Sequence, residues 1–318
     1  MSLIEVQNLS RSFGPTQALQ GLSFSVEQGE IFGLLGPDGS GKTTCLRILA
    51  GLVAPGAGRV TVLNKDIGQE PDAVKQDIGY MAQPAGLYDD LTVRENISFY
   101  ADLYHVPPRT YAERLKRLLE FSGLAPFNDR YFRNLSGGMK QKAGLMCALI
   151  HTPKILFLDE PTNGVDPVSR RDFWKILYEL KREQVTIVVA STYLDEVDRC
   201  HRVALFDRGR VRLVMEPLAM RTLMTGTLFK LTCSNRRQAL KLLRTLPQVQ
   251  NPSVFGAGIH FTLADPSGSN DIHASLTAAG LTEVQIEETP PGLEDVYLAL
   301  MEETGFKGPR GQGSKGEE

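Results

Sequence analysis

The fold is decided by the stretch Gly36-Pro37-Asp38-Gly39-Ser40-Gly41-Lys42-Thr43, which fits the phosphate-binding pattern G-x-x-x-x-G-K-[ST]. An apolar run at residues 31–35 precedes it, and residues 44–50 follow with apolar side chains at helical spacing. Glycines let backbone N–H groups surround phosphate oxygens, and a helix start adds a positive field there. Lys42 supplies a charge for the phosphates, and the Thr43 hydroxyl suits Mg²⁺. A chance glycine-rich turn is the alternative, but the flanking strand and helix argue against it.

Length and composition predict an ordinary two-domain globular chain, with 318 residues, 42% of them apolar and 23% charged. A net charge of −2 argues against a nucleic-acid backbone as the main partner. The longest apolar runs, such as residues 185–190, are too short to cross a bilayer, and the N-terminus lacks a signal-peptide pattern. The four cysteines have neither metal nor disulfide spacing, so we expect packing roles in a reducing cytoplasm.

Strands alternate with helices over the first two thirds of the chain, which predicts a largely parallel sheet with ligands at the carboxyl ends of its strands. We expect helices at residues 91–124, 143–150 and 169–181. We expect strands at residues 4–9, 22–26, 31–35, 60–63, 78–81, 155–158 and 185–190, and a hairpin of residues 202–206 and 211–214.

Polar side chains follow or begin several of these elements. Ser136 opens the second apolar helix with a Ser-Gly-Gly turn, which favours a further anion site, although serine is also a common helix cap. Asp159 and Glu160 follow a buried strand. There Asp159 is placed to hold Mg²⁺ through water and Glu160 to polarise an attacking water, and a solvated acidic turn is the alternative.

Two further residues are ambiguous from the sequence alone. Gln83 follows a strand, where an amide can bind a metal or water, but a single glutamine is weak evidence. Phe13 lies upstream of the glycine loop, and it either stacks on a nucleotide base or packs in the core.

The C-terminal third has the pattern βαββαβ, which predicts a small α+β ferredoxin-like domain. Its elements are expected at residues 227–233, 236–246, 249–255, 259–264, 273–279 and 284–288. A final helix has an apolar face made of Leu293, Val296, Tyr297, Leu300 and Met301. This face packs against its own domain or contacts a partner. His260 and His273 are expected to be structural, and residues 305–318 to be disordered.

In order and spacing the motifs resemble those of ABC ATPases. The matching positions are the Walker A loop at Gly36–Thr43, the Q-loop at Gln83, the signature at Leu135–Gln141, Walker B at Ile155–Glu160 and the D-loop at Asp166. The resemblance covers roughly residues 1–215 and is specific, because the LSGG signature separates ABC proteins from other P-loop NTPases. The signature's continuation and the ending Pro291–Tyr297 are typical of ATP-binding subunits of bacterial ABC-2-type exporters.

The resemblance implies an α/β fold of the P-loop NTPase, ABC ATPase type. Such a fold has a mostly parallel sheet, an antiparallel β subdomain and a helical subdomain, here at about residues 84–150. We expect the ATPase domain at residues 1–218, the ferredoxin-like accessory domain at 219–304 and the tail at 305–318.

The resemblance also implies ATP and Mg²⁺ as ligands. The residues that it assigns to ATP are Phe13, Gly36, Pro37, Asp38, Gly39, Ser40, Gly41, Lys42, Thr43, Thr44, Ser136, Gly137, Gly138, Gln141 and Asp166. Those assigned to Mg²⁺ are Thr43, Gln83 and Asp159, and those assigned to catalysis are Glu160, Gln83 and Thr192.

The family's mechanism involves a second ATPase domain and a membrane partner. Two domains close head to tail, so that each ATP lies between the Lys42 loop of one chain and the Ser136 signature of the other. Closure drives an ABC-2 permease, which we expect to dock near Gln83–Glu95, where Leu87 and Tyr88 are expected to be exposed. The chain would then lie at the cytoplasmic face of the inner membrane, with no nucleic-acid partner.

One position departs from the family pattern. Where the family has a switch histidine in a run like S-T-H-Y-L-D-E, this chain has Thr192, and His201 lies too far along to replace it. Threonine cannot carry the imidazole's proton, and losing one such contact slows hydrolysis by about 10²–10³-fold. Because tandem ABC-2 exporter ATPases often lack this histidine in one half, we expect a heterodimer with an intact ATPase domain, with a homodimer as the alternative.

Two other functions stay open at this point. The first is a subunit that clamps ATP without hydrolysing it, which Thr192 favours and Glu160 opposes. The second is an ABC protein acting on ribosomes or DNA, which the single ATPase domain and the absence of sustained heptads disfavour.

Overall fold

The computed structural model describes residues 2–83 and 86–303, with side chains described up to residue 299. Its contacts divide the chain into two compact units, Met1–Met215 and Glu216–Glu318. Each unit has a hydrophobic core of its own. Within the described residues, no helix is both long enough and apolar enough to span a membrane.

The first unit is built on a six-stranded sheet in the order β10-β9-β3-β8-β7-β6. Its strands are β3 (Ile31–Leu35), β6 (Ile78–Met81), β7 (Ile155–Asp159), β8 (Thr186–Ser191), β9 (Arg202–Asp207) and β10 (Arg210–Met215). All run parallel except β10, which forms an antiparallel hairpin with β9 at the edge. Because β3, β7 and β8 are buried on both faces, their sequences are continuous apolar runs. The expected mostly parallel sheet is confirmed.

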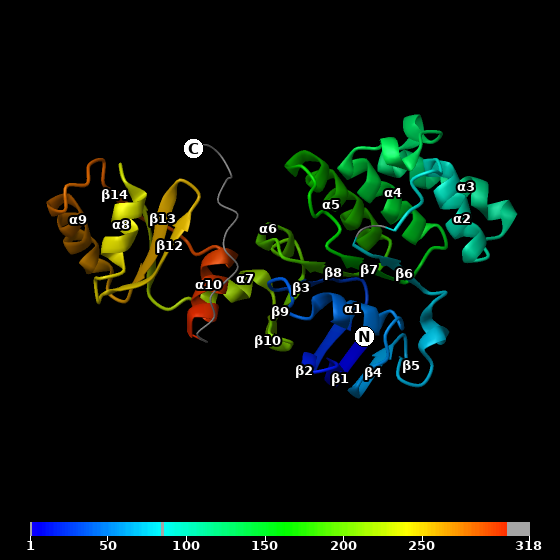
Figure 1. The fold of residues 1–318 in the computed structure, drawn as a ribbon, viewed down its shortest axis with the longest axis horizontal. Coiled ribbons are helices and arrows are strands. Elements are labelled where there is room, and N and C mark those ends of the chain that lie inside the picture. The colour runs from blue at the N-terminus through cyan, green and yellow to red at the C-terminus, as the bar shows by residue number, and fades with distance from the viewer. Residues whose placement is uncertain (1, 84–85, 304–318) are drawn as a thin grey trace. The chain divides into compact units, whose positions relative to one another are not determined.

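Helices cover both faces of this sheet (Figure 1). α4 (Gly137–Leu149) packs on β6 and α5 (Pro167–Arg182) on β8, whereas α1 (Lys42–Leu49) lies against the opposite face. Beyond α1 lies an antiparallel sheet in the order β2-β1-β4-β5. Its strands are β1 (Ser2–Phe13), β2 (Thr16–Glu27), β4 (Ala57–Val62) and β5 (Lys65–Asp66). The buried side of α1 therefore shares one core with both sheets, which fixes the start of this helix.

A continuous helical segment over residues 91–124, as the pattern predicts, is wrong. The segment forms α2 (Val93–Leu103) and α3 (Pro108–Ser122). His105 adopts a positive φ of 55° and Pro107-Pro108 follows, so the helical hydrogen bonds cannot continue. Both helices pack against α4. The remaining short elements of the unit are α6 (Leu194–Val197), η1 (Pro71–Val74), η2 (Ala125–Phe127) and η3 (Phe132–Asn134).

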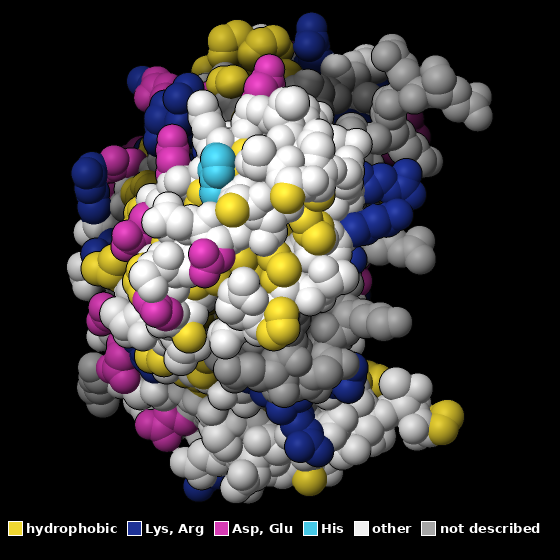
Figure 2. Space-filling view, turned by 90° about the vertical axis from the view of Figure 1, so that its left-hand side faces the viewer, with side chains coloured by type: hydrophobic (Ala, Val, Ile, Leu, Met, Phe, Trp, Pro, Cys, Tyr) yellow, Lys and Arg dark blue, Asp and Glu magenta, His cyan; other side chains and the backbone are white. Residues whose placement is uncertain are grey.

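The second unit has the predicted ferredoxin-like order of elements. These are β11 (Thr227–Thr232), α8 (Arg236–Leu243), β12 (Val249–Phe255), β13 (Gly258–Leu263), α9 (Ser269–Ala278) and β14 (Gln285–Glu288). The strands pair antiparallel in the order β12-β13-β11-β14, which confirms the expected fold. On the side that carries α9, hydrophobic side chains are scattered among polar and acidic ones (Figure 2).

Three helical elements flank this βαββαβ core. α7 (Pro217–Met220) and η4 (Arg221–Leu223) precede it, and α10 (Leu293–Glu303) follows. Leu293, Val296 and Tyr297 are buried, and α10 packs on α7, η4 and β12 of its own unit. The side chains of Leu300 and Met301, and the tail of residues 305–318, lie outside the described part of the chain.

Candidate nucleotide-binding site

The candidate site lies along one edge of the parallel sheet. β3 leads into the Gly36–Thr43 loop, β7 into Glu160, β8 into Thr192 and β6 into Gln83, and these strands are neighbours in the sheet (Figure 1). Because parallel strands end at the same edge, the topology brings these segments together from distant parts of the sequence.

The lysine of the glycine loop is enclosed by the loop itself. Lys42 is 4% exposed, and its Nζ donates hydrogen bonds to the carbonyl oxygens of Gly36 (2.8 Å) and Pro37 (3.0 Å). Burial lowers the pKa of Lys42, although the carboxylate of Glu160 opposes this shift. The buried hydroxyl of Ser40 has no hydrogen-bond partner among the described residues. A buried ammonium and an orphaned hydroxyl in one loop fit a phosphate group, which can accept from both.

Gly41 fixes the junction between the loop and α1. Its φ is 105°, in the left-handed region that favours glycine. A Cβ atom there would lie 2.7 Å from Cδ2 of Leu19 and 2.8 Å from the carbonyl oxygen of Ala18. Only glycine fits, and it caps α1 without a side-chain hydrogen bond, so the first N–H groups of the helix are left for a ligand.

A carboxylate and a hydroxyl meet where Mg²⁺ is expected. The Thr43 hydroxyl donates to Oδ1 of Asp159 (2.9 Å), and the Tyr80 hydroxyl donates to Oδ2 (3.4 Å). Burial raises the pKa of Asp159 despite the Thr43 bond, and burial raises the pKa of Tyr80 to about 12. Within the described residues, no group of three or more His, Cys, Asp or Glu could hold a metal alone. The oxygen donors fit Mg²⁺, which is usually held by one or two protein oxygens together with substrate phosphates.

Glu160 follows Asp159 with an unusual backbone. Its φ of 47° lies in the left-handed region, and its side chain is 11% exposed. Oε1 lies 3.8 Å from Nζ of Lys42, and Oε2 accepts a hydrogen bond from Nδ2 of Asn163 (3.3 Å). Burial raises the pKa of Glu160, although Lys42 opposes this. A carboxylate with a raised pKa beside the lysine loop suits a group that polarises water.

The structure places Thr192 directly after β8, half-buried. His201 directly precedes β9, at the amino end of that strand, and its Nδ1 accepts a hydrogen bond from the backbone N–H of Ile31 (3.1 Å). Ile31 is the first residue of β3 and the glycine loop follows the last one, so His201 cannot reach the candidate site.

The second anion-binding feature is the start of α4. Ser136 is exposed and caps the helix by accepting a bond from the Met139 N–H (3.4 Å). Gly138 is buried, and a Cβ atom on it would lie 2.6 Å from Cβ of Ser169 in α5. The carboxylate of Asp166 accepts from the Ser169 N–H (2.9 Å), and hydrogen bonds to Ser169 lower its pKa. The helix starts that carry the signature and D-loop residues therefore pack against each other.

The remaining sequence-predicted residues lie at the edges of the site. Phe13 is 46% exposed, so it does not pack in the core, and the Arg11 guanidinium lies 4.8 Å from its ring centre. Gln83 is exposed and Gln141 half-buried. Tyr88 is 50% exposed, as expected, but the same expectation is wrong for Leu87, which is half-buried; residues 84–85 of that segment lie outside the described ranges.

Sequence reasoning did not include three residues that touch this site. They are Tyr80, which bonds Asp159, Asn163, which bonds Glu160, and Tyr193, whose hydroxyl donates to Oδ1 of Asn163 (3.2 Å). The only available signal was position, since each lies within a few residues of a motif.

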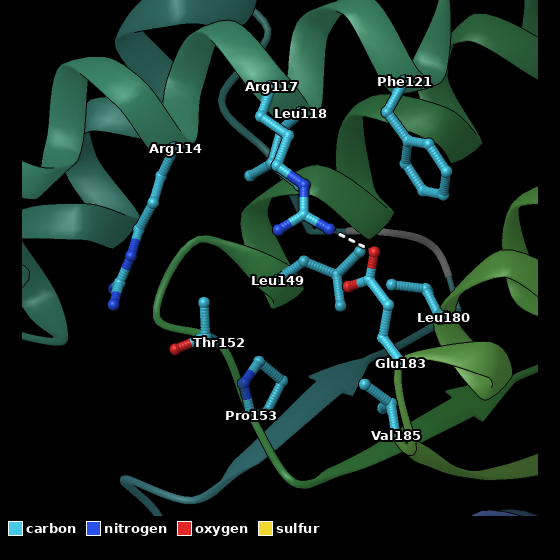
Figure 3. A pocket seen from close by; sticks show the side chains of 10 residues that line it. All are labelled: Arg114, Arg117, Leu118, Phe121, Leu149, Thr152, Pro153, Leu180, Glu183 and Val185. Atoms are coloured by element: carbon cyan, nitrogen blue, oxygen red, sulfur yellow. Dashed lines mark hydrogen bonds and ion pairs between the residues drawn. The ribbon is translucent and has the colours of Figure 1, made fainter.

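A pocket of about 220 Å³ lies elsewhere in the first unit (Figure 3). Leu149, Leu180 and Val185 line it, and the ion pair of Arg117 with Glu183 crosses it. Val185 precedes β8, so this pocket lies near the amino ends of the strands, opposite the candidate site. It is not part of the nucleotide site, which is an open edge.

The strand, glycine loop, buried lysine and Thr–Asp pair define a P-loop nucleotide-binding protein, and the additional Ser-Gly-Gly helix start is the feature of the ABC class. The family model described as ABC transporter matches residues 19–163. The chain is 41% identical over 286 residues to the probable multidrug ABC transporter ATP-binding protein YbhF of Escherichia coli (strain K12), covering 89% of this chain but 49% of that protein, so it spans about half of YbhF.

Other relatives match over nearly their whole length. The chain is 34% identical over 299 residues to the Nod factor export ATP-binding protein I of Rhizobium sp. (strain N33), covering 93% of this chain and 96% of that protein. A solved chain described as the dimeric structure of a bacterial ABC transporter cassette has 25% identity and a TM-score of 0.63, covering 67% of this chain and 98% of its own. The chain therefore belongs to the family of ABC transporter ATP-binding proteins.

Proposed function

We propose that the chain binds and hydrolyses Mg²⁺–ATP as the nucleotide-binding subunit of an exporter. The observation that carries this proposal is one constellation at the sheet edge. There the enclosed amine of Lys42 lies 3.8 Å from Glu160, and the Thr43 hydroxyl lies 2.9 Å from Asp159. Bound Mg²⁺ would supply charge neutralisation for the phosphates, held by Thr43 and Asp159 together with Gln83.

Each residue of the candidate site then has a defined task. Lys42 exchanges its bonds to the loop carbonyls for bonds to phosphate oxygens, which favours tight binding because the amine is already buried. Glu160 orients the attacking water and accepts its proton, and the raised pKa of this carboxyl moves it toward the working pH. Phe13, exposed at the end of β1, offers a face for the base.

We infer that two ATPase domains share the nucleotides. Ser136 is exposed at the start of α4, so its hydroxyl and the first N–H groups of the helix are open to a second domain. A related bacterial cassette is described as dimeric, which supports a head-to-tail pair. Because Thr192 stands where the family has a histidine, we propose an asymmetric pair in which this chain's own site is slow and its Ser136 serves a faster partner site.

The exporter assignment follows from the relatives. Proteins described as a multidrug ABC transporter ATP-binding protein and a Nod factor export ATP-binding protein match most of this chain. We propose that an ABC-2-type permease docks near Gln83–Glu95, where Tyr88 is exposed, and holds the chain at the cytoplasmic face of the inner membrane.

Substitution of the lysine tests nucleotide binding. Lys42→Ala removes at least one charge-assisted bond to phosphate, so ATP affinity should fall by more than about tenfold in equilibrium dialysis. Lys175→Ala is the matched control, because this lysine is 67% exposed on α5 and should leave affinity unchanged. Unchanged affinity of Lys42→Ala would refute the proposed site.

Single-turnover assays decide between hydrolysis and clamping. The full chain is used in excess over radiolabelled ATP, and wild type should release phosphate. Glu160→Gln should bind ATP equally well but release phosphate at least about 10²-fold more slowly. A wild-type chain that binds ATP yet releases no phosphate, even with its permease and partner domain, would instead support the clamping function. ATP-dependent association of Glu160→Gln, followed by gel filtration, tests the two-domain arrangement.

A further inference from the structure

The loops after β7 and β8 are tied together beneath the candidate site by one buried carboxylate. Glu196 is 1% exposed, and it accepts hydrogen bonds from the hydroxyls of Thr162 and Ser191, the latter at 2.7 Å. Thr162 follows Glu160 by two residues, and Ser191 directly precedes Thr192. The loop after β7 carries Glu160, and the loop after β8, here called the switch loop, carries Thr192 and Tyr193. Glu196 therefore holds the two loops at a fixed separation.

Above this tie, a chain of hydrogen bonds reaches the catalytic carboxylate. The backbone N–H of Tyr193 donates to Oγ of Ser191 (3.0 Å), which fixes the position of the Tyr193 backbone in the switch loop. The Tyr193 hydroxyl donates to Oδ1 of Asn163 (3.2 Å), and Nδ2 of Asn163 donates to Oε2 of Glu160 (3.3 Å). The Arg170 guanidinium lies 4.3 Å from the centre of the Tyr193 ring and holds its plane.

The directions of these bonds fit the chemistry of each group. A phenol donates to the amide oxygen and the amide nitrogen donates to a carboxylate, so Asn163 has one orientation that satisfies both neighbours. The other carboxylate oxygen of Glu160 faces Lys42 at 3.8 Å. The carboxylate is thus held from two sides, and the backbone beneath it is fixed by the hydrogen bond from the Glu160 N–H to the carbonyl oxygen of Ala190 in β8 (2.9 Å).

We propose that Asn163 and Tyr193 are positioning residues for Glu160. Tyr193 reaches the carboxylate from the loop after β8 through Asn163 of the loop after β7, and the pair so orients the base in a chain whose residue 192 is a short threonine. This inference rests on the proposed hydrolysis at the Lys42–Glu160 site. Neither residue needs to touch ATP: Tyr193 acts through Asn163, and Asn163 acts through Glu160.

Conservative variants of the full chain test the proposal under single-turnover and steady-state conditions. Tyr193→Phe keeps the ring below Arg170 and removes only the hydroxyl, so kcat should fall by about 3- to 10-fold, the worth of one neutral hydrogen bond, with KM for ATP unchanged. Asn163→Ala should lower kcat by at least as much. Tyr178→Phe is the matched control, since this tyrosine is 36% exposed on α5 and lies outside the hydrogen-bond chain.

A double-mutant cycle separates positioning from general support of the fold. In the Asn163→Ala background the Tyr193 hydroxyl has lost its acceptor, so Tyr193→Phe should change kcat by less than about twofold. Additive losses, a rise in KM, or a Tyr193→Phe chain with wild-type kcat would each overturn the inference. An absence of hydrolysis in wild type with its partners would instead remove the proposed function, and the inference with it, whereas a failure of the relay alone leaves wild-type hydrolysis and its dependence on Glu160 intact.

Discussion

Replacing Gly138 by alanine would place a methyl group between the signature helix and α5. The new Cβ atom would lie 2.6 Å from Cβ and 2.7 Å from Oγ of Ser169. Ordinary contact between carbon atoms needs about 3.5–4.0 Å, so the start of α4 must move by about 1 Å relative to α5. Ser169 cannot yield easily, because Cβ is attached directly to its backbone and its N–H is bonded to Asp166.

The size of the expected loss of stability follows from comparing Gly138 with the neighbouring Gly137. Overpacking of this kind costs about 1–3 kcal/mol, whereas alanine in a helix gains about 0.5–1 kcal/mol over glycine. At Gly137 a Cβ atom meets only the carbonyl oxygen of Gly164, at 3.8 Å, so Gly137→Ala shares the gain without the clash. We therefore expect Gly138→Ala to be less stable than Gly137→Ala by about 1–3 kcal/mol, or on the order of 5 °C for a unit of this size.

Scanning calorimetry of the first unit's transition measures this difference. Adding Ser169→Gly to Gly138→Ala removes both clashing atoms, so it should restore most of the loss when compared with Ser169→Gly alone. The hydrolysis rate of Gly138→Ala should also fall, and Ser169→Gly should restore part of it, because a displacement of about 1 Å can cost about 10²-fold in rate. Equal melting temperatures for the two alanine variants, or no rescue by Ser169→Gly, would refute the packing argument.

Three further predictions concern charge, the switch position and pH. Asp159→Asn removes the carboxylate that the Thr43 hydroxyl contacts, so the Mg²⁺ concentration for half-maximal hydrolysis should rise by at least about tenfold in a metal titration. Thr192→His should raise kcat by up to about 10²–10³-fold, and an unchanged kcat would remove the case for an impaired site. Burial lowers the pKa of His151, so the unfolded chain binds its proton more tightly and stability is lost as pH falls through the ordinary value near 6.5. His151→Phe keeps the stacking on Tyr104 but cannot titrate. Its free energy of unfolding, measured in urea, should therefore fall less between about pH 7 and 5 than that of wild type, and an equal fall would contradict this.

The parts of the fold that local pattern encodes were predictable. The glycine loop, the apolar run of β7 and the βαββαβ order of the second unit each depend on neighbouring residues, and the structure has all three. The break between α2 and α3 is also encoded in the sequence, by Pro107-Pro108, and the expectation of one helix over residues 91–124 did not take this pair into account.

Contacts between distant segments were not predictable in the same way. The Tyr193 bond to Asn163 joins residues 30 apart in the sequence, and it exists only because β7 and β8 are adjacent in the sheet. The contact of Gly138 with Ser169 has the same origin, since α4 and α5 meet only after both pack on the sheet. No local spacing of residues carries such information, so these roles needed the structure.

The same contacts connect the two halves of the proposed mechanism. Gly138 touches Ser169, Ser169 bonds Asp166, and the short turn before Asp166 carries Asn163, which bonds Glu160. If two domains share the nucleotides, Ser136 acts on the partner's ATP while Glu160 acts on the chain's own. A Gly138→Ala chain paired with an intact partner domain should therefore slow hydrolysis at the partner's site, although every residue of the partner is wild type. Labelled nucleotide trapped at each site would show this, and a loss confined to the variant chain's own site would mean that Ser136 serves no second protomer.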